Sequence, residues 1–252
     1  WHIECSVMAN CCLDEKIDIH GGGIDLLFPH HENEIAQSEA ATGKKFANYW
    51  VHGGFLTIND EKMSKSLGNF LTIRDTLERY SPESVRYFLI TTHYRSPFNW
   101  SAQAVSDAHS ALVRLYTALR GLTLDDNADD DQLSPSAEAF QQRFIAAMCD
   151  DFNTPEAIAV LFDLAHEINR CRDNGNMTEA IALAQWLKHL GNVLGILQQS
   201  PQAFIQAGSG VGQSDELTSD DIDQLIIERD AARAEKNWQR ADEIRQQLTA
   251  HG

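Results

Sequence analysis

The sequence has no run of apolar residues that approaches the ~18 needed to cross a membrane as a helix. It also has no basic segment followed by an apolar one, the pattern that marks a protein for secretion. Its five cysteines are an odd number without regular spacing, which excludes a disulfide framework. These absences predict a cytoplasmic protein that is not inserted in a membrane, with reduced thiols of which some are free to bind metal.

Positive charge is scarce: the 252 residues hold 20 Lys and Arg against 37 Asp and Glu, a formal net charge of -17. Because phosphate neutralisation needs clustered cations, this balance argues at first against a nucleic-acid partner. The charges are unevenly spread, however. Acidic residues crowd into residues 125–131, whereas basic residues outnumber acidic ones between residues 62 and 95. An acidic chain can therefore carry a local basic site, and the net charge decides little.

The first 60 residues predict a parallel α/β layer. We predict a buried strand at residues 1–5, where the chain starts, and a second short strand at residues 16–20. A glycine turn at 21–23 follows, then a helix over 29–43 that ends at a glycine, then a strand-like run over 49–58. Alternation of strand, helix and strand is typical of α/β folds with a parallel sheet.

From about residue 72 the apolar residues recur at helical spacing. Helices are predicted over residues 72–80, 82–92, 101–122, 136–149, 154–171 and 177–198. An acidic linker is predicted at 123–135 and a glycine-containing flexible linker at 200–219. The last segment, 220–251, is predicted to be a pair of helices that bends near Asn237. The overall prediction is an α/β part followed by an all-α helical bundle.

The most specific string is Lys62-Met63-Ser64-Lys65-Ser66, at residues 62–66. Two lysines and two serines next to a glycine favour a mobile loop that closes over a polyphosphate. Lys65 would then neutralise the charge that develops on a pyrophosphate leaving group. For a generic lysine-rich pentapeptide, a solvated basic turn is the commoner interpretation.

A second constellation, at residues 29–34, has the spacing of a metal site. His30 and Glu34 stand at i and i+4 and therefore share one face of a helix. An imidazole and a carboxylate can both bind zinc, and Cys5 could join them from a neighbouring strand. His31 also shares a face with Glu34, at i and i+3, so spacing alone does not select between the two histidines. Adjacent histidines are, besides, common at surfaces and in cores.

Taken together, the motifs resemble those of cysteinyl-tRNA synthetases, which are class I aminoacyl-tRNA synthetases. The matching strings are Trp-His-Ile-Glu-Cys-Ser at 1–6, His-Gly-Gly-Gly at 20–23, Phe-Pro-His-His-Glu-Asn-Glu at 28–34, Lys-Met-Ser-Lys-Ser at 62–66 and Asp-Asp-Phe-Asn-Thr-Pro-Glu-Ala at 150–157. They occur in the family's order and cover nearly the whole chain. The resemblance implies that the α/β part is the second part of a Rossmann-like class I catalytic domain.

This resemblance implies a catalytic zinc ion held by Cys5, His30 and Glu34. The fourth ligand of the family is a cysteine that this chain does not contain, whereas Cys11 and Cys12 match no ligand and are expected to be incidental thiols. Because a substrate thiolate binds zinc and a serine hydroxyl binds it poorly, the metal would select cysteine. Editing would then be unnecessary.

The resemblance also implies the remaining site residues. Trp1 matches the aromatic wall of the amino-acid pocket, and Lys65 matches the lysine that contacts ATP, with Lys62 beside it in the catalytic string. The adenylate-binding strip is matched by His20, Gly21, Gly22 and Asp25.

The implied domains follow the same order. They are a catalytic part at 1–70, a connecting helical region at 71–122, an acidic linker at 123–135, a tRNA-facing DALR-like bundle at 136–199, a linker at 200–219 and the start of an anticodon-binding unit at 220–252. The family's His-x-Gly-His motif does not occur, and the chain starts with Trp1. We therefore expect a piece that lacks an N-terminal half and the extreme C-terminus and is inactive alone.

The implied reaction is cysteine–tRNA ligation. ATP, with Mg²⁺, would activate cysteine to cysteinyl-adenylate, and the cysteinyl group would pass to the 3′-end of the cysteine tRNA, in a protein expected to be a monomer. Two alternatives stay open. One is a ligase that joins cysteine to an amino sugar, and the other is a non-catalytic paralogue that binds zinc or RNA.

Overall fold

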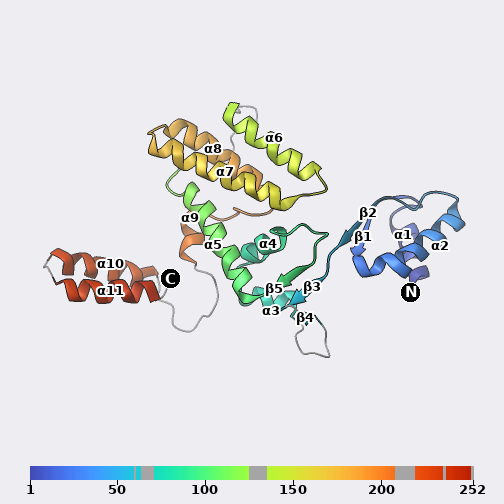
Figure 1. Cartoon of the computed structure of the whole chain (residues 1–252), viewed down its shortest axis with the longest axis horizontal. Coiled ribbons are helices and arrows are strands. Elements are labelled where there is room, and N and C mark those ends of the chain that lie inside the picture. The colour runs from blue at the N-terminus through green and yellow to red at the C-terminus, as the bar shows by residue number, and fades with distance from the viewer. Residues whose placement is uncertain (60, 64–70, 125–134, 208–218, 235–236, 251–252) are drawn as a thin grey trace. The chain divides into compact units, whose positions relative to one another are not determined.

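The computed structural model describes residues 1–59, 61–63, 71–124, 135–207, 219–234 and 237–250 (Figure 1). The chain divides into two compact units. The first comprises residues 1–70, 88–104 and 142–160, and the second comprises residues 71–87, 105–141 and 161–252.

The first unit begins with a small parallel α/β layer. Its elements are α1 (His2–Cys12), β1 (Ile17–Gly23), the short 3-10 turn η1 (Ile24–Leu26), the π-type turn η2 (Leu27–His31), α2 (Glu32–Thr42) and β2 (Ala47–Gly53). Strands β1 and β2 pair in parallel, with His20 opposite Trp50 and Gly22 opposite His52. The predicted parallel arrangement of strand, helix and strand is therefore confirmed.

The prediction of a buried strand at the start of the chain is wrong, because this segment is helix α1. The less exposed residues among its first nine recur at intervals of three and four, as on one face of a helix; they are His2, Cys5, Ser6, Ala9 and Asn10. Ser6 is buried and donates a hydrogen bond to Gln37 of α2, 3.0 Å away. The apolar residues that suggested a strand lie on the exposed side.

The predicted glycine turn at 21–23 is also wrong, because these residues complete β1. A Cβ atom on Gly21 would lie 2.9 Å from the carbonyl oxygen of Val51, and one on Gly22 would lie 3.0 Å from the His31 ring. These glycines therefore permit close approach of a neighbouring strand and an imidazole. Residue Gly43 does end α2, in the left-handed conformation expected of a helix C-terminus, at φ 68°. The helix itself starts at Glu32, after η2, rather than at Pro29.

The predicted run over 49–58 is two strands that belong to different sheets. Strand β3 (Leu56–Ile58) pairs antiparallel with β4 (Glu61–Lys62) and parallel with β5 (Phe98–Trp100). The break falls at Gly54, where a Cβ atom would collide with the Ser96 carbonyl oxygen. Strand β5 lies inside the region that the sequence assigned to connecting helices.

The periodic segments are helical as predicted, with shifted ends. The helices are α3 (Ile73–Leu77), α4 (Pro82–Ile90), α5 (Ala102–Leu119), α6 (Pro135–Cys149), α7 (Thr154–Asp173), α8 (Met177–Val193), α10 (Ser219–Ala234) and α11 (Trp238–Ala250). Helices α10 and α11 form the predicted pair, joined by hydrogen bonds from Arg240 to Glu228. None of the helices in the described ranges is both long and apolar enough to span a membrane.

The second unit contains a helix that the sequence did not predict, α9 (Pro201–Gln206). It occupies part of the expected flexible linker, of which residues 208–218 lie outside the described residues. Ser200 caps the helix by accepting a hydrogen bond from the Ala203 N–H, 3.2 Å away. Phe204 is only 2% exposed and stacks on Tyr116, with ring centroids 4.2 Å apart. Most of the acidic linker, residues 125–134, also lies outside the described residues.

Candidate metal and nucleotide site

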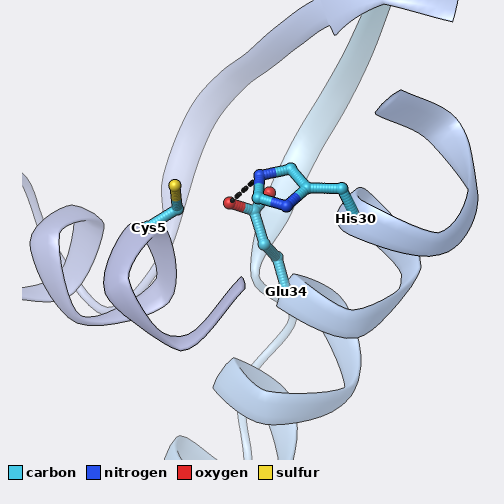
Figure 2. A group of neighbouring side chains, drawn as sticks. All are labelled: Cys5, His30 and Glu34. Atoms are coloured by element: carbon cyan, nitrogen blue, oxygen red, sulfur yellow. Dashed lines mark ion pairs between the residues drawn. The ribbon is translucent and has the colours of Figure 1, made fainter. Parts of the chain in front are cut away.

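Three side chains from α1, η2 and α2 converge in the first unit. Figure 2 shows Cys5 of α1 facing His30 and Glu34, and the ligand atoms of all three lie within 4.8 Å of one another. His30 Nε2 is 3.3 Å from Glu34 Oε1, the i, i+4 pair that the spacing predicted. The structure thus brings the three predicted zinc ligands together, although Cys5 comes from a helix rather than from a strand.

Glu34 is shared with a second group of donors. Its other oxygen, Oε2, lies 2.8 Å from His20 Nε2, and His20, His31 and Glu34 also have their ligand atoms within 4.8 Å of one another. Glu34 is 1% exposed and His31 is 2% exposed. The structure therefore keeps both His30 and His31 as possible metal ligands, because each belongs to one of the two trios.

Both trios offer donors that zinc accepts, since the second provides two imidazoles and a carboxylate. Zinc binds thiolate sulfur, imidazole nitrogen and carboxylate oxygen, and the trio of Cys5, His30 and Glu34 offers one of each. Burial and the nearby Glu34 carboxylate raise the pKa of the Cys5 thiol. A cation at this place would oppose the effect of Glu34 and favour the thiolate. The residues present therefore fit the metal that the sequence resemblance implies.

A layer of aromatic and imidazole rings surrounds these donors. His31 Nδ1 lies 2.8 Å from His52 Nε2, and His2 Nδ1 lies 2.8 Å from His30 Nδ1. Trp1 stacks on His30, with ring centroids 4.2 Å apart. Burial lowers the pKa of His31, and repulsion from neighbouring His20 lowers it further. The predicted pocket residue Trp1 is 70% exposed, and its stacking on His30 places it beside the trio.

The residues expected to hold the adenylate lie along β1 and just after it. His20, Gly21 and Gly22 are successive residues of this strand, and Asp25 follows in η1 as an exposed side chain. His20 reaches Glu34, so the predicted strip and the predicted metal trio are contiguous. At its glycines the strip packs closely against Val51 and the His31 ring, so a side chain at either position would disturb the site.

The lysine string is described only in part. Lys62 ends strand β4, opposite Thr57 of β3. Lys65 lies outside the described residues, as does the rest of residues 64–70. The predicted roles of both lysines therefore stay predictions.

Sequence reasoning missed three residues of the site: His2, Trp50 and His52. A signal for two of them was present, because Trp50 and His52 stand two residues apart in a predicted strand and so share one face. Their rings are nearly parallel, at 4°, with centroids 6.1 Å apart. His2 could not be found in this way, because its position depends on α1 being a helix.

Comparison with protein families gives three consecutive matches. Residues 1–110 match tRNA synthetases class I (C) catalytic domain, residues 143–198 match the DALR domain, and residues 215–252 match the cysteinyl-tRNA ligase anticodon binding domain.

Curated relatives match along the whole chain. The cysteine–tRNA ligases of Azotobacter vinelandii and Stutzerimonas stutzeri are each 56% identical over 252 residues, which is 100% of this chain and 52% of theirs. That of Methylococcus capsulatus is 55% identical over 256 residues, 53% of its length. The chain therefore spans about half the length of the curated relatives it matches.

A solved structure shares the fold. It is the crystal structure of the ternary complex of Agrobacterium radiobacter K84 agnB2 LeuRS, tRNA and LeuAMS, with a TM-score of 0.50. The match covers 75% of this chain and 26% of that one at 20% identity. At this identity the likeness concerns the fold alone, and it agrees with the match to a class I catalytic domain.

Proposed function

Because the chain belongs to the cysteine–tRNA ligase family, we propose that the whole protein of which it forms part ligates cysteine to the cysteine tRNA. The observation that carries this proposal is the convergence of Cys5, His30 and Glu34 beside the exposed ring of Trp1. A thiol, an imidazole and a carboxylate within one ligand sphere are suited to a zinc ion, and a zinc ion is suited to a substrate thiol.

In this proposal Cys5, His30 and Glu34 hold the zinc ion, with one ligand for each of the elements α1, η2 and α2. When bound, the metal supplies affinity for the thiolate of cysteine over the hydroxyl of serine. His20 bonds Glu34 and His2 contacts His30, so each of these two ligands is oriented by a further imidazole. Partners of this kind fix the direction of a metal ligand.

The chemical step that we propose is adenylation. A carboxylate oxygen of cysteine attacks the α-phosphorus of ATP, a new P–O bond forms, and the bond to the β-phosphate breaks to release pyrophosphate. Lys65 and Lys62 stabilise the charge that collects on the leaving group, and Mg²⁺ accompanies the ATP. His20, Gly21, Gly22 and Asp25 line the place of the adenylate. In a second step the terminal ribose of the tRNA takes the cysteinyl group and releases AMP.

The organisation of the chain supports this assignment. Strands β1 and β2 are parallel and joined through α2, which is the connection found in Rossmann-like sheets. We therefore propose the domain boundaries given by the sequence, with the catalytic part at 1–70, the bundle at 136–199 and the anticodon-binding unit from 220. The matches at 143–198 and 215–252 favour a tRNA over an amino sugar as the acceptor. Cytoplasmic location and a monomeric state belong to the same proposal.

The test is cysteine-dependent exchange of pyrophosphate into ATP, followed by aminoacylation of the cysteine tRNA. In the whole protein, Cys5→Ala should abolish cysteine-dependent exchange while Cys11→Ala, an exposed thiol on the same helix, should retain it. Pyrophosphate exchange without aminoacylation of the tRNA, together with ligation of cysteine to an amino sugar, would identify the ligase that uses an amino sugar as acceptor. If the unmutated whole protein catalyses no exchange, the remaining alternative is a non-catalytic paralogue that binds zinc or RNA.

A further inference from the structure

The turn between α6 and α7, whose place in the chain Figure 1 shows, has an uncommon backbone conformation. Asp151 and Phe152 both have positive φ, at 55° and 54°, in the left-handed region that non-glycine residues seldom adopt. Two backbone hydrogen bonds hold the turn, from the Phe152 N–H to Met148 and from the Asn153 N–H to Ala147. Such conformations persist only where the surroundings determine them, and they are concentrated at functional places.

The side chain of Asp151 anchors the loop that precedes β5. Its Oδ1 accepts a hydrogen bond from the Tyr94 hydroxyl at 2.6 Å and one from Arg95 Nη2 at 3.1 Å, and its Oδ2 accepts one from Arg95 Nε. Arg95 also lies over the Tyr94 ring, 5.3 Å from its centroid. The hydrogen bonds from Arg95 and Tyr94 lower the pKa of Asp151 to about 2, so the carboxylate is ionised at neutral pH.

The anchored loop in turn fixes the beginning of β3. The Gly54 N–H donates to the Tyr94 carbonyl at 2.7 Å, and the Phe98 N–H donates to the Phe55 carbonyl at 2.9 Å. Gly54 is so close to Ser96 that a side chain would collide with the Ser96 carbonyl. All these residues belong to the first unit.

Strands β3 and β4 need such support, because they have three and two residues. A two-stranded pair of this length is unstable alone in water. Strand β3 is completed by its parallel pairing with β5, and Asn59 donates to the Trp100 carbonyl at 3.0 Å. The place of β4, and with it the backbone of Lys62, therefore depends on the loop that Asp151 anchors.

We propose that Asp151 is a positioning residue for ATP binding, acting through Tyr94 and Arg95 on the β3–β4 pair that carries Lys62. The part that concerns ATP rests on the proposed function, whereas the mechanical link from Asp151 to β3–β4 does not. The turn between α6 and α7 would thus set where the lysine string begins, although it lies about 90 residues further along the chain.

The link is tested by amide hydrogen exchange on the 252-residue chain. Asp151→Asn removes the charge but keeps a residue that tolerates positive φ, and Asp151→Gly keeps the backbone freedom without any side chain. Both should speed exchange in residues 54–62 and 98–100 and leave α2 unchanged. Asp150→Asn is the matched control, because it removes the same charge one residue earlier.

Three outcomes would overturn the link. Exchange in residues 54–62 could be the same as in the unmutated chain, it could rise equally throughout the first unit, or it could rise as much in Asp150→Asn. The first would show that β3–β4 holds its place without Asp151. The second would show only general destabilisation, and the third would show an effect of net charge.

Steady-state pyrophosphate exchange in the whole protein tests the functional part. Asp151→Asn should raise the KM for ATP by about two- to thirty-fold, the range of couplings carried between separate sites, and leave the KM for cysteine unchanged. Tyr94→Phe, which removes one of the three hydrogen bonds, should give a smaller rise. Equal changes in both KM values, or none, would overturn the positioning role. If the unmutated whole protein catalyses no exchange, the proposed function and the ATP role both fail, and hydrogen exchange still decides the link.

Discussion

Glu34 is the residue on which the site depends, because each of its two carboxylate oxygens meets a different histidine. Oε1 lies 3.3 Å from His30 and Oε2 lies 2.8 Å from His20. With a metal bound, one oxygen would be a ligand and the other would stay with His20. A nearly inaccessible carboxylate needs such partners, since a buried charge without them is very costly.

The two ligand trios make opposite predictions for two substitutions. If the trio with Cys5 holds the zinc ion, Cys5→Ala should have a large effect on metal affinity. The loss should exceed the roughly 10–100-fold that follows removal of a residue hydrogen-bonded to a metal ligand. His31→Ala, which removes a ring bonded to His52, should lower metal affinity less. The measurement is zinc content by atomic spectroscopy after dialysis against a series of chelator concentrations. A larger loss in His31→Ala than in Cys5→Ala would assign the metal to the other trio.

A second residue-scale prediction concerns Lys65. A charge that acts on the leaving pyrophosphate works mainly in the transition state, and loss of such a donor costs about 10²–10³ in rate. In the whole protein, Lys65→Ala should slow single-turnover adenylation by about this factor and leave cysteine affinity unchanged. The matched control is Lys45→Ala, which also removes one lysine charge, because the Lys45 ammonium donates a hydrogen bond to the Asn48 carbonyl. A normal rate of adenylation in Lys65→Ala would contradict the role of Lys65 in stabilising the leaving pyrophosphate.

At this scale, much of the site could be predicted from the sequence, for a definable reason. The i, i+4 spacing of His30 and Glu34 is local, and the helical turn η2, which leads directly into α2, brings the two side chains together. His2 and His52 are joined to the site only through tertiary packing. No local pattern could place His2, because the segment that carries it was predicted to be a strand.

The same division between local and tertiary causes applies to whole elements. Long helices such as α5 and α7 follow from periodic apolar residues, which a sequence displays directly. Two of the missed elements, β5 and α9, have three and six residues and are fixed by what they touch. Strand β5 exists because β3 pairs with it, and α9 exists because Phe204 enters the core of the second unit.

The packing around α9 predicts a dependence of stability on pH. His109 is 8% exposed, lies 3.1 Å from the Ser84 hydroxyl through Nδ1 and stacks on Phe204. Burial lowers the pKa of His109, so the folded chain holds the neutral ring. Below the ordinary histidine pKa of about 6.5, the unfolded chain binds a proton that the folded chain does not. This contribution to stability is therefore present above that pH and is lost as the pH falls toward the pKa of the folded state.

Urea denaturation at pH 7.5 and at pH 5.5 measures this contribution. The unmutated chain should lose more stability between the two values than His109→Gln, in which the titrating group is absent. His189→Gln, which removes a histidine from α8, controls for the general effect of removing a charge. Equal losses in the unmutated chain and in His109→Gln would contradict the prediction.

How much of the chain a stable helical part requires is a property of the whole molecule. Helical periodicity suggests that residues 101–200 suffice for a bundle, because each helix there carries its own apolar face. The second unit, however, contains Glu83, which is 6% exposed and accepts hydrogen bonds from the Tyr116 hydroxyl at 2.8 Å and the Leu197 N–H at 2.6 Å. It also contains Phe204. Both lie outside residues 101–200.

We therefore expect a polypeptide of residues 71–207 to be more stable than one of residues 101–200. Removal of Glu83 leaves the buried Tyr116 hydroxyl without this acceptor, which costs about 1–3 kcal/mol. Loss of the Phe204 ring adds about 3–5 kcal/mol, the usual effect of removing a buried aromatic side chain. Urea denaturation followed by circular dichroism compares the two polypeptides, and Glu83→Gln and Phe204→Ala in the longer one separate the two causes. Equal stability of both polypeptides would show that the helices from α5 to α8 hold together without these contacts, as periodicity alone suggests.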